Sequence, residues 1–404
     1  MAGKTAKTLY DHPSDMEPLL PQKGEERSSA LALALIRGAE GLRSSLHPIT
    51  RAAVADLVRS MNSYYSNLIE GHRTRPRDID AALRKDFSTD AGQRALQIQH
   101  VAHMEVQAET EIRLRDMPAG DICSTEFLCW LHEEFYRRLP EQFRKLEDEK
   151  TKAHIVEPGK LRLSEVSIGR HMAPSNKKLK QFLKRFGEFY GPLVNRDPGS
   201  LIAAAAAHHR LTWIHPFLDG NGRVARLFTH AWFIKAHVDS DGLWTISRGL
   251  ARRKADYQSA LANADEKRLN DYDGRGYLSQ KYLGEFCWFF LAVAADQVDF
   301  MQELLALDGM LNRISGYGER RESAKELPRG SARVLRELFL RGEIGRGETA
   351  RIIGASPRTA QKVIGELLAQ RLVTSGSPKG PLRLGFPADA AGHYFPNLYP
   401  AGAD

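Results

Sequence analysis

One run of thirteen residues, from Ile214 to Arg226, holds the side chains that are best suited to chemistry. It reads I-H-P-F-L-D-G-N-G-R-V-A-R. His215 is a base that titrates near neutral pH, and Asp219 is a hard oxygen ligand of the kind that Mg²⁺ or Mn²⁺ prefers. The run therefore combines a proton acceptor and a metal-seeking carboxylate within one short loop.

The second half of this run predicts a phosphate site. Gly220, Asn221 and Gly222 form a turn with little side-chain bulk, and the apolar spacing that follows predicts a helix opening near Gly222. A helix N-terminus presents free N–H groups and the positive end of a dipole, which favour an anion. Arg223 and Arg226 lie three residues apart, so both can reach that anion from the first turn.

Eight positions of the run resemble the core motif of the Fic family. The pattern is His-Pro-Phe, two variable residues, Gly-Asn-Gly-Arg, two variable residues and Arg. Chance agreement at eight positions is on the order of one in ten billion per start position. The resemblance covers roughly residues 50–300 and implies a protein adenylyltransferase, which transfers AMP from ATP to a Ser, Thr or Tyr hydroxyl of a protein.

The resemblance also implies a role for each residue of the loop. His215 would be the catalytic base, and Asp219 would hold Mg²⁺ or Mn²⁺ against the phosphates of ATP. The other expected ligands bind the phosphates: Gly220, Asn221 and Gly222 cradle the α- and β-phosphates, Arg223 binds the β-phosphate and Arg226 binds the γ-phosphate. Members of this family often modify themselves, so the chain is one expected substrate and any other protein target is open.

Other functions stay open from the sequence. A phosphotransferase of the Doc branch has lysine where this chain has Gly222, which disfavours that activity. A relative that transfers phosphocholine keeps a similar loop, so the phosphate donor is not settled. The alternative from another class is a transcription regulator whose Fic core senses nucleotide. The same site could also remove AMP, which would make the enzyme bifunctional.

An expected helix over Thr50 to Glu70 carries a second motif, with Thr50 as N-cap and Gly71 as the terminating residue. Ser66 and Glu70 lie four residues apart on one face. A glutamate in the last turn faces the negative end of the helix dipole, so it calls for a cationic partner. Ser66, Glu70 and Gly71 resemble the inhibitory motif of the family, which implies that Glu70 pairs with Arg226 and blocks productive ATP binding. The alternative is a solvated helix-end glutamate.

Two further segments have expected roles in binding. Leu161 to Ile168 alternates apolar and polar residues and predicts a small hairpin. It resembles the flap that clamps the target in this family, with Arg162, Val166, Ser167, Ile168 and Gly169 at the matching positions; a purely structural hairpin is the alternative. Tyr257 is a candidate for stacking on the nucleotide base or an ordinary core tyrosine. His132 matches a helix histidine of the family and is expected to be structural.

The elements around these motifs predict a mainly α fold, a Fic-type helical bundle with a small β-hairpin flap. We expect a poorly ordered arm over residues 1–28, then helices over 29–42, 90–115, 200–213 and 278–311. Thr89 is the expected N-cap of the second of these, and the alanine-rich third should pack closely at the centre. The predicted domains are an N-terminal helical region with the inhibitory helix (1–100), a catalytic core (101–309) and a C-terminal module (310–404).

The C-terminal module is expected to be a winged helix-turn-helix domain. Helices are predicted over 331–341, 348–353 and 356–370, followed by a hairpin over 373–384. Residues 310–404 contain 15 Lys and Arg against 9 Asp and Glu, so this module carries most of the net charge of +8. The residues placed to meet DNA lie near the start of the third helix: Arg358, Thr359, Gln361 and Lys362. DNA binding and protein contact both remain open.

Length and composition set the remaining limits. The 404 residues are 42% hydrophobic and 27% charged, which is typical of a globular chain. The most apolar run, residues 286–295, is shorter than the roughly 20 residues of a membrane span, so no membrane partner is expected. Three cysteines without metal-ligand spacing suggest reduced thiols and a cytoplasmic location. A monomer and a homodimer remain equally open.

Overall fold

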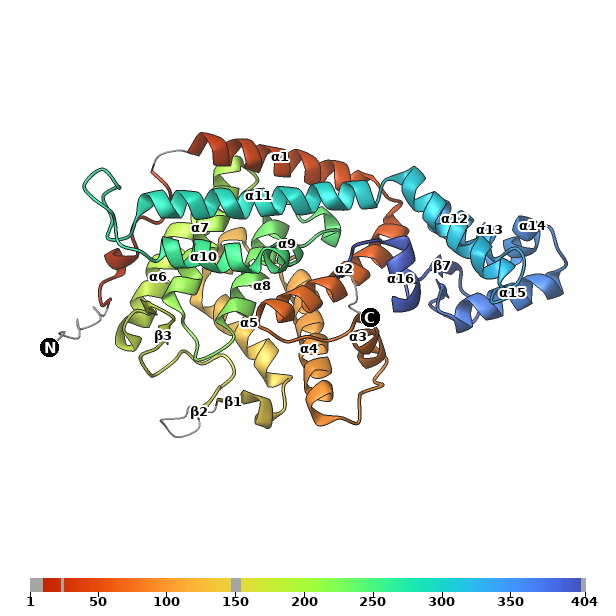
Figure 1. Ribbon diagram of the computed structural model, residues 1–404, viewed down its shortest axis with the longest axis horizontal. Helices are drawn as coiled ribbons and strands as arrows, with labels where there is room; N and C mark the ends of the chain where they lie inside the picture. The colour runs from red at the N-terminus through yellow and green to blue at the C-terminus, as the bar shows by residue number, and fades with distance from the viewer. Residues whose placement is uncertain (1–9, 23–24, 147–153, 401–404) are drawn as a thin grey trace.

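The computed structural model of the chain describes residues 10–22, 25–146 and 154–400. The structure is mainly helical, as the sequence predicts. A helical body fills most of the molecule, and a smaller module extends from one end (Figure 1). The helices of the body are α1 (Glu25–Ser44), α2 (Pro48–Ile69), α3 (Pro76–Leu83), α4 (Ala91–Arg113), α5 (Thr125–Arg137), α6 (Leu179–Tyr190), α7 (Pro198–Ile214), α8 (Asn221–Lys235), α9 (Ile246–Arg252), α10 (Lys254–Ala264) and α11 (Gln280–Leu304).

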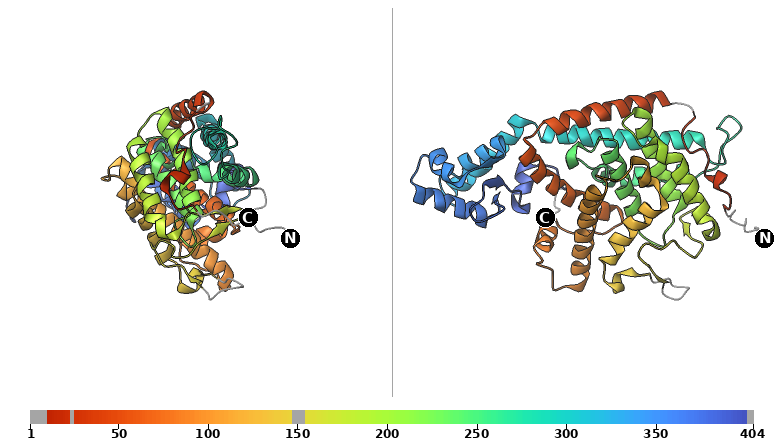
Figure 2. Two further views of the ribbon diagram at one scale, coloured as in Figure 1. Left: turned by 90° about the vertical axis from the view of Figure 1, so that its left-hand side faces the viewer. Right: turned by 180° about the vertical axis from the view of Figure 1, so that it is seen from behind.

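Helices α7 and α8 form the centre of the body, and the loop between them carries the predicted chemistry. The middle of α7 is alanine-rich, and the residues from Ala203 to Ala207 are at most 1% exposed. Such small side chains let neighbouring helices approach the α7 backbone closely. Outside them, α1 and α11 run side by side along one edge of the body (Figures 1 and 2).

Helix α2 begins two residues earlier than the sequence predicts. Its N-cap is His47, whose imidazole accepts a hydrogen bond from a backbone N–H of the first turn. Thr50, the expected N-cap, lies inside that turn, and its hydroxyl donates to the carbonyl of Phe339 at 3.4 Å. Gly71 terminates the helix as predicted, with a φ of +91° that favours glycine.

One other predicted boundary is wrong in detail. The N-cap of α4 is Asp90 rather than Thr89, because the Asp90 carboxylate accepts from a backbone N–H one turn later. The helical segment expected over residues 278–311 consists of α11, which ends at Leu304, and the start of a separate helix, α12 (Leu307–Ser323). The break between these two helices marks the passage from the helical body to the C-terminal module.

The N-terminal segment packs against the body, whereas the sequence predicts a poorly ordered arm over residues 1–28. Met16 and Leu19 are at most 1% exposed. The guanidinium of Arg210, which lies on α7 and is fully buried, donates two hydrogen bonds to the carbonyl of Pro18. The prediction is therefore wrong for residues 10–22, and α1 already begins at Glu25; residues 1–9 and 23–24 lie outside the described part.

The predicted hairpin is present but shorter and later than expected. Strand β3 (Ser167–Ile168) pairs antiparallel with β4 (His171–Met172), and Gly169 in the turn has a φ of +58°. Residues 161–166, where the alternation begins, form no strand. A second antiparallel pair joins β1 (Lys145–Leu146) to β2 (His154–Ile155).

The C-terminal module contains the predicted three helices and hairpin, with one additional strand. The helices are α13 (Ser331–Arg341), α14 (Thr349–Ile353) and α15 (Pro357–Ala369). Strand β5 (Glu343–Ile344), which the sequence analysis missed, pairs with β7 (Leu382–Leu384), and β7 also pairs with β6 (Val373–Thr374). The sheet order is therefore β5-β7-β6, and Leu382 and Leu384 of β7 are buried.

The end of the chain returns to the helical body. After α16 (Ala388–Tyr394), the following residues lie along α2, where the Tyr65 hydroxyl donates to the carbonyl of Leu398 at 2.9 Å. The ring of Tyr399 meets the ring of Tyr64 edge-on at a centroid distance of 5.2 Å. Helix α2 therefore contacts both the helices of the body and the last described residues of the chain.

Among the described residues, none of the helices combines the length and the apolar character that a membrane span requires. The three cysteines are free thiols, as the sequence analysis expects.

Candidate active site

The backbone of the loop between α7 and α8 is shaped by two left-handed residues. His215 ends α7 with φ 50° and ψ 62°, and Gly220 precedes α8 with a φ of +78°. A Cβ on Gly220 would lie 2.6 Å from the ring of Tyr136, so glycine is required there for both conformation and space. Helix α8 opens at Asn221, one residue before the predicted start, which leaves the first backbone N–H groups of the helix without helical acceptors.

Asn221 holds the loop closed on itself. Its amide oxygen accepts from the backbone N–H of Phe217 at 2.9 Å, and its amide nitrogen donates to the Phe217 carbonyl at 2.8 Å. From the sequence, Asn221 is expected to help cradle phosphates. In the structure both ends of its side chain are engaged by the loop backbone, so its visible contribution is to set the shape of the cradle.

A column of three stacked rings supports the loop from α5. The Phe217 ring stacks on His132 at a centroid distance of 4.1 Å, and His132 stacks on Tyr136 at 4.5 Å. The backbone N–H of Gly159 donates to Nδ1 of His132, so its Nε2 donates to the carbonyl of Asp219 at 3.3 Å. Burial lowers the pKa of His132 to about 4, which keeps the ring neutral. His132 is thus structural, as predicted.

Asp219 has one carboxylate oxygen engaged and one without a hydrogen bond from the described residues. Its Oδ2 accepts from the Tyr136 hydroxyl at 2.6 Å, and no hydrogen bond reaches Oδ1 from the described residues. No group of three or more His, Cys, Asp or Glu side chains in the described part could hold a metal ion by itself. Mg²⁺ is commonly bound by one or two carboxylates together with substrate phosphates and water, so a single free carboxylate oxygen beside a phosphate cradle fits such an ion.

His215 is held from its backbone side and is only partly accessible. Its carbonyl accepts from Nε of Arg162 at 2.8 Å, and the backbone N–H of Arg162 donates to the carbonyl of Pro216 at 2.9 Å. Burial lowers the pKa of His215 to about 4, and a hydrogen bond to the backbone of Thr212 only partly opposes this shift. The imidazole is therefore neutral at pH 7 and free to accept a proton.

The predicted flap lies directly after this anchor. Arg162, one of its expected residues, connects the segment to the loop between α7 and α8 through the two bonds just described. Val166 extends the hairpin, because its carbonyl accepts from the backbone N–H of Ala173 at 3.1 Å. Ser167, Ile168 and Gly169 are exposed, so the outer face of the hairpin is accessible.

The guanidinium of Arg226 is clamped by the end of α2. Its Nη2 donates to Oε1 of Glu70 at 2.6 Å and to the carbonyl of Ser66 at 3.1 Å, and its Nε donates to the Ser66 hydroxyl at 2.9 Å. Only 2% of the Arg226 side chain is exposed, against 32% for Glu70. The predicted pairing of Glu70 with Arg226 is present in the structure, and Ser66 adds two contacts that the sequence did not predict.

The carboxylate of Glu70 reaches the start of α8, where the sequence predicts the phosphate site. A Cβ on Gly222 would lie 2.5 Å from Oε1 of Glu70, so the absence of a side chain at Gly222 makes room for this carboxylate. Burial raises the pKa of Glu70, but the positive charges of Arg226 and Arg223 outweigh burial and lower it below its ordinary value. Glu70 is therefore ionised and occupies the side of the loop where an anion would bind.

Arg223 is also held by α2 and the segment after it. Its Nε donates to the side-chain oxygen of Asn67 at 3.3 Å, and its Nη2 lies 3.2 Å from Nδ1 of His72. The guanidinium also lies over the ring of Phe135 at 5.1 Å. The sequence analysis missed Asn67 and His72, although both lie within four residues of the inhibitory motif.

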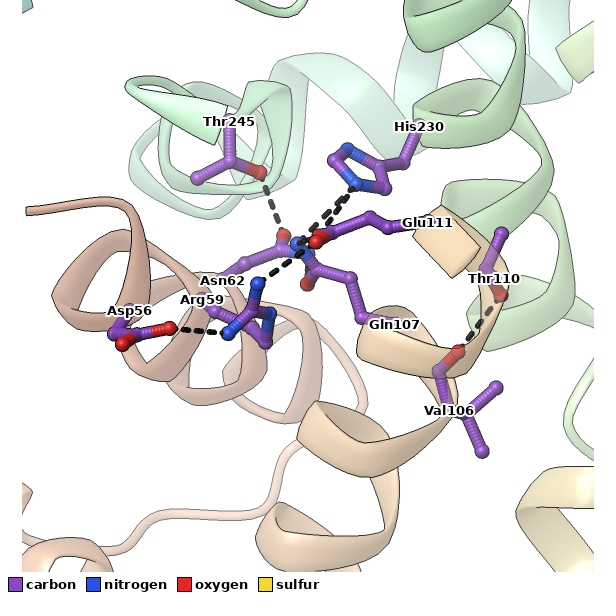
Figure 3. A network of polar contacts seen from close by, with 9 residues as sticks. All are labelled: Asp56, Arg59, Asn62, Val106, Gln107, Thr110, Glu111, His230 and Thr245. Carbon is purple, nitrogen blue, oxygen red and sulfur yellow. Dashed lines mark hydrogen bonds and ion pairs between the residues drawn. The ribbon is translucent and has the colours of Figure 1, made fainter. Parts of the chain in front are cut away.

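A buried polar network keeps α2 in register with its neighbours (Figure 3). The Asn62 amide donates to the Gln107 side chain at 2.7 Å, and its oxygen accepts from the Thr245 hydroxyl at 2.6 Å. Asn62, Gln107 and Thr245 are all buried, so each bond replaces one that water would otherwise supply. These bonds join α2 to α4 and to the start of α9.

An ionic part of the same network joins α2 and α4 to α8. The Arg59 guanidinium donates to Oε2 of Glu111 at 2.7 Å, and Nε2 of His230 lies 3.5 Å from Oε1 of Glu111 (Figure 3). Burial alone raises the pKa of Glu111, but hydrogen bonds and charges from His230 and Arg59 outweigh it and hold the pKa at about 2. His230 lies one turn after Arg226 on α8. The network therefore also stabilises the part of α8 that carries Arg226.

Tyr257 lies in the core rather than at the surface of the loop between α7 and α8. It is 3% exposed, and its hydroxyl lies 2.7 Å from Nε2 of His208, which is fully buried on α7. Burial raises the pKa of Tyr257 to about 12. The structure thus favours the core-tyrosine alternative over base stacking at this position.

The four predicted DNA contacts lie together on α15. Arg358, Thr359, Gln361 and Lys362 are all exposed, and the Ser356 hydroxyl caps the helix by accepting from the backbone N–H of Thr359. The opposite side of α15 is buried in the module through Ala360, Val363 and Leu367. The structure therefore leaves one polar, basic helix face open to solvent.

Comparison with known families identifies the segment that contains the loop. Residues 122–233 match the model described as the Fic/DOC family. The matched segment runs from just before α5 into the last turn of α8, so it includes the ring column, the flap and the phosphate loop.

Curated relatives are similar over a limited stretch. The protein adenylyltransferase Fic of Nematostella vectensis is 37% identical over 87 residues, which is 21% of this chain and 20% of that protein. The protein of the same name from Drosophila willistoni is 33% identical over 81 residues, or 20% of this chain and 16% of that protein. The chain thus matches a fifth or less of the length of these relatives.

A solved structure is similar over most of the chain. A Fic family protein from Desulfovibrio desulfuricans G20 superposes with a TM-score of 0.51 at 18% identity, covering 90% of this chain and 98% of that one. At this identity the likeness concerns the fold, and it confirms the mainly helical architecture.

Proposed function

This chain carries a Fic domain at residues 122–233, and from that premise we propose that it is a protein adenylyltransferase held inactive by α2. The observation that carries the proposal is the conjunction at one loop of His215, the free oxygen of Asp219, the helix N-terminus of α8 and two arginines. The relatives named above, which carry the adenylyltransferase name, support the same activity.

In the proposed reaction, a hydroxyl of the target protein attacks the α-phosphorus of ATP. The new bond joins the hydroxyl oxygen to phosphorus, and the bond to the β-phosphate oxygen breaks, so that pyrophosphate leaves. As the new bond forms, the attacking oxygen becomes acidic and gives its proton to the neutral imidazole of His215. The pKa of about 4 keeps this imidazole unprotonated before the reaction.

The phosphates would lie at the N-terminus of α8. The backbone N–H groups that follow Gly220 and the guanidinium of Arg223 would bind the α- and β-phosphates. A Mg²⁺ or Mn²⁺ ion held by Asp219 would neutralise charge on the phosphates when bound. Arg226 would bind the γ-phosphate and align ATP for the attack.

Inhibition follows from the two demands on Arg226. Its guanidinium already serves Glu70 and Ser66, and one planar fork cannot also bind the γ-phosphate in a bidentate manner. ATP would then bind weakly or out of line with the target hydroxyl. If the Glu70–Arg226 pair weakens productive ATP binding by more than ~1.4 kcal/mol, releasing the pair should raise AMP transfer about tenfold or more.

The test compares three proteins incubated with labelled ATP and Mg²⁺. We expect wild type to modify itself weakly, Glu70→Gly to do so strongly, and Glu70→Gly with His215→Ala not at all. Intact-mass spectrometry would identify the adduct as one AMP moiety. Equal labelling of wild type and Glu70→Gly would reject the inhibitory role, and an adduct of another mass would reject AMP as the transferred group.

We also propose a second role for the C-terminal module, which is duplex DNA binding. The order of its helices and strands, and the open basic face of α15, support this role. Contact with another protein is the competing use of the same face.

A further inference from the structure

Tyr136 is buried beneath the phosphate loop and touches the proposed metal ligand. It lies on α5, four residues after His132, and is 1% exposed. Its hydroxyl donates to Oδ2 of Asp219 at 2.6 Å. Its ring fills the space that a Cβ on Gly220 would need, so the ring and the glycine turn fit together.

The direction of this hydrogen bond is fixed. A carboxylate oxygen can only accept a hydrogen bond, whereas the phenol hydroxyl carries a proton to donate, so the tyrosine is the donor. Hydrogen bonds from a hydroxyl to an ionised carboxylate are short and strong, in agreement with 2.6 Å.

The two residues of α5 fix Asp219 at both ends. His132 holds its backbone carbonyl through Nε2, and Tyr136 holds one oxygen of its side chain. A free aspartate side chain can rotate about two bonds, but this one is pinned with Oδ1 left unbonded by the described residues. The carboxylate is thus prepared to offer that single oxygen to a cation.

We propose that Tyr136 is a positioning residue, which orients the carboxylate of Asp219 so that its free oxygen binds the divalent cation of the metal–ATP complex. This inference rests on the proposed function for the role of Asp219. It predicts that the Tyr136 hydroxyl matters for metal affinity, whereas the ring matters for packing.

The test uses Tyr136→Phe, which keeps the ring and removes only the hydroxyl. In the Glu70→Gly background, we expect the Mn²⁺ concentration for half-maximal AMP transfer to rise about tenfold, since a hydrogen bond to a charged group is lost. The rate at saturating Mn²⁺ should change much less. A merely structural role would lower stability and rate without changing the metal dependence.

A second measurement does not depend on turnover. In the Glu70→Gly and His215→Ala background, binding of Mn²⁺ in the presence of ATP can be followed by electron paramagnetic resonance. We expect the same weakening of about tenfold on adding Tyr136→Phe. If Glu70→Gly transferred no AMP, the proposed function would fail, whereas this binding measurement would still decide the role of Tyr136.

Tyr190→Phe is the matched control. Its hydroxyl is also fully buried and donates at 2.6 Å, but to the carbonyl of Leu19, away from the loop. We expect a comparable loss of stability and an unchanged Mn²⁺ dependence. Unchanged metal affinity in Tyr136→Phe, or an equal shift in Tyr190→Phe, would overturn the inference.

Discussion

Ser66 contributes two of the contacts that hold Arg226, one through its hydroxyl and one through its carbonyl. Glu70 supplies the charge, but Ser66 orients the guanidinium so that Nη2 meets the carboxylate. The spacing of four residues places both on the same face of α2, toward α8. The clamp is therefore a property of two side chains, and each should contribute separately to inhibition.

Ser66→Ala should activate the protein partially. The variant loses the bond from Nε of Arg226 to the hydroxyl and keeps the ion pair, so AMP transfer should rise about threefold to tenfold, less than in Glu70→Gly. Self-modification with labelled ATP measures this. Ser63→Ala is the matched control, because the Ser63 hydroxyl bonds to His100 and not to Arg226. Activation of the control to the same extent would assign the effect to general loosening of α2.

The pKa of His215 predicts the pH profile of the reaction. Burial lowers this pKa to about 4, so the imidazole is already unprotonated throughout the range from about pH 6 to pH 7.5. The kcat/KM of Glu70→Gly should therefore stay flat over this range. An unperturbed histidine would lose half of the activity near pH ~6.5 and more below it. Initial rates at constant ionic strength, with circular dichroism to verify folding, distinguish the two.

At the scale of elements, the site is made by helices that converge on one loop. Helix α5 supports the loop from one side through its ring column, and α2 closes it from the other side through the clamp. Helix α2 can hold this position because Asn62 and Arg59 attach it to α4 and to Thr245 before α9 (Figure 3). Glu111 of α4 lies in turn beside His230 of α8. In the proposed function, the packing of α2 would therefore hold the protein in its inhibited state.

Asn62→Ala should destabilise the fold by about 1–3 kcal/mol, because Gln107 and Thr245 would each lose a buried partner. Urea unfolding followed by circular dichroism measures this free energy. Asn195→Ala, at an exposed position, is the control and should change the unfolding free energy by less than about 0.5 kcal/mol. Equal effects of the two substitutions would mean that the network contributes little.

At the scale of the whole molecule, the C-terminal module extends from the end of the body where α2 begins (Figures 1 and 2). It is joined to α2 through Thr50 and Phe339, and to α3 by the ion pair of Arg371 with Asp80 at 2.8 Å. The exposed face of α15 takes no part in these contacts. The module can therefore offer that face to a partner while it remains attached to the body.

The full chain should bind duplex DNA weakly and with strong salt dependence. The slope of log K against log salt is negative, and each phosphate contact that is lost makes it less steep by about 0.9. Arg358→Gln with Lys362→Gln should therefore weaken binding and flatten this slope in a fluorescence anisotropy titration. Lys180→Gln with Lys184→Gln, which removes the same charge from exposed positions of α6, is the control. A flat baseline for wild type at low salt would favour the protein-contact alternative.

The sequence by itself predicted the candidate reactive groups of the loop, because these groups lie close together along the chain. The base, the carboxylate, the glycine turn and the two arginines are contiguous between His215 and Arg226, so their proximity does not depend on tertiary packing. The helical pattern and the left-handed end of α2 at Gly71 are equally local. Nearby hydrogen bonds and conformational preferences determine such features.

Only the tertiary structure decided which distant groups reach the loop. Tyr136 is separated from Asp219 by 83 residues, and nothing in the local sequence distinguishes its hydroxyl from that of a core tyrosine. The docking of residues 10–22 is supported by the buried guanidinium of Arg210, which donates two hydrogen bonds to the carbonyl of Pro18. Burial, and the requirement that buried polar groups find partners, are properties of the packed helices, so a pattern read along the chain could not predict them.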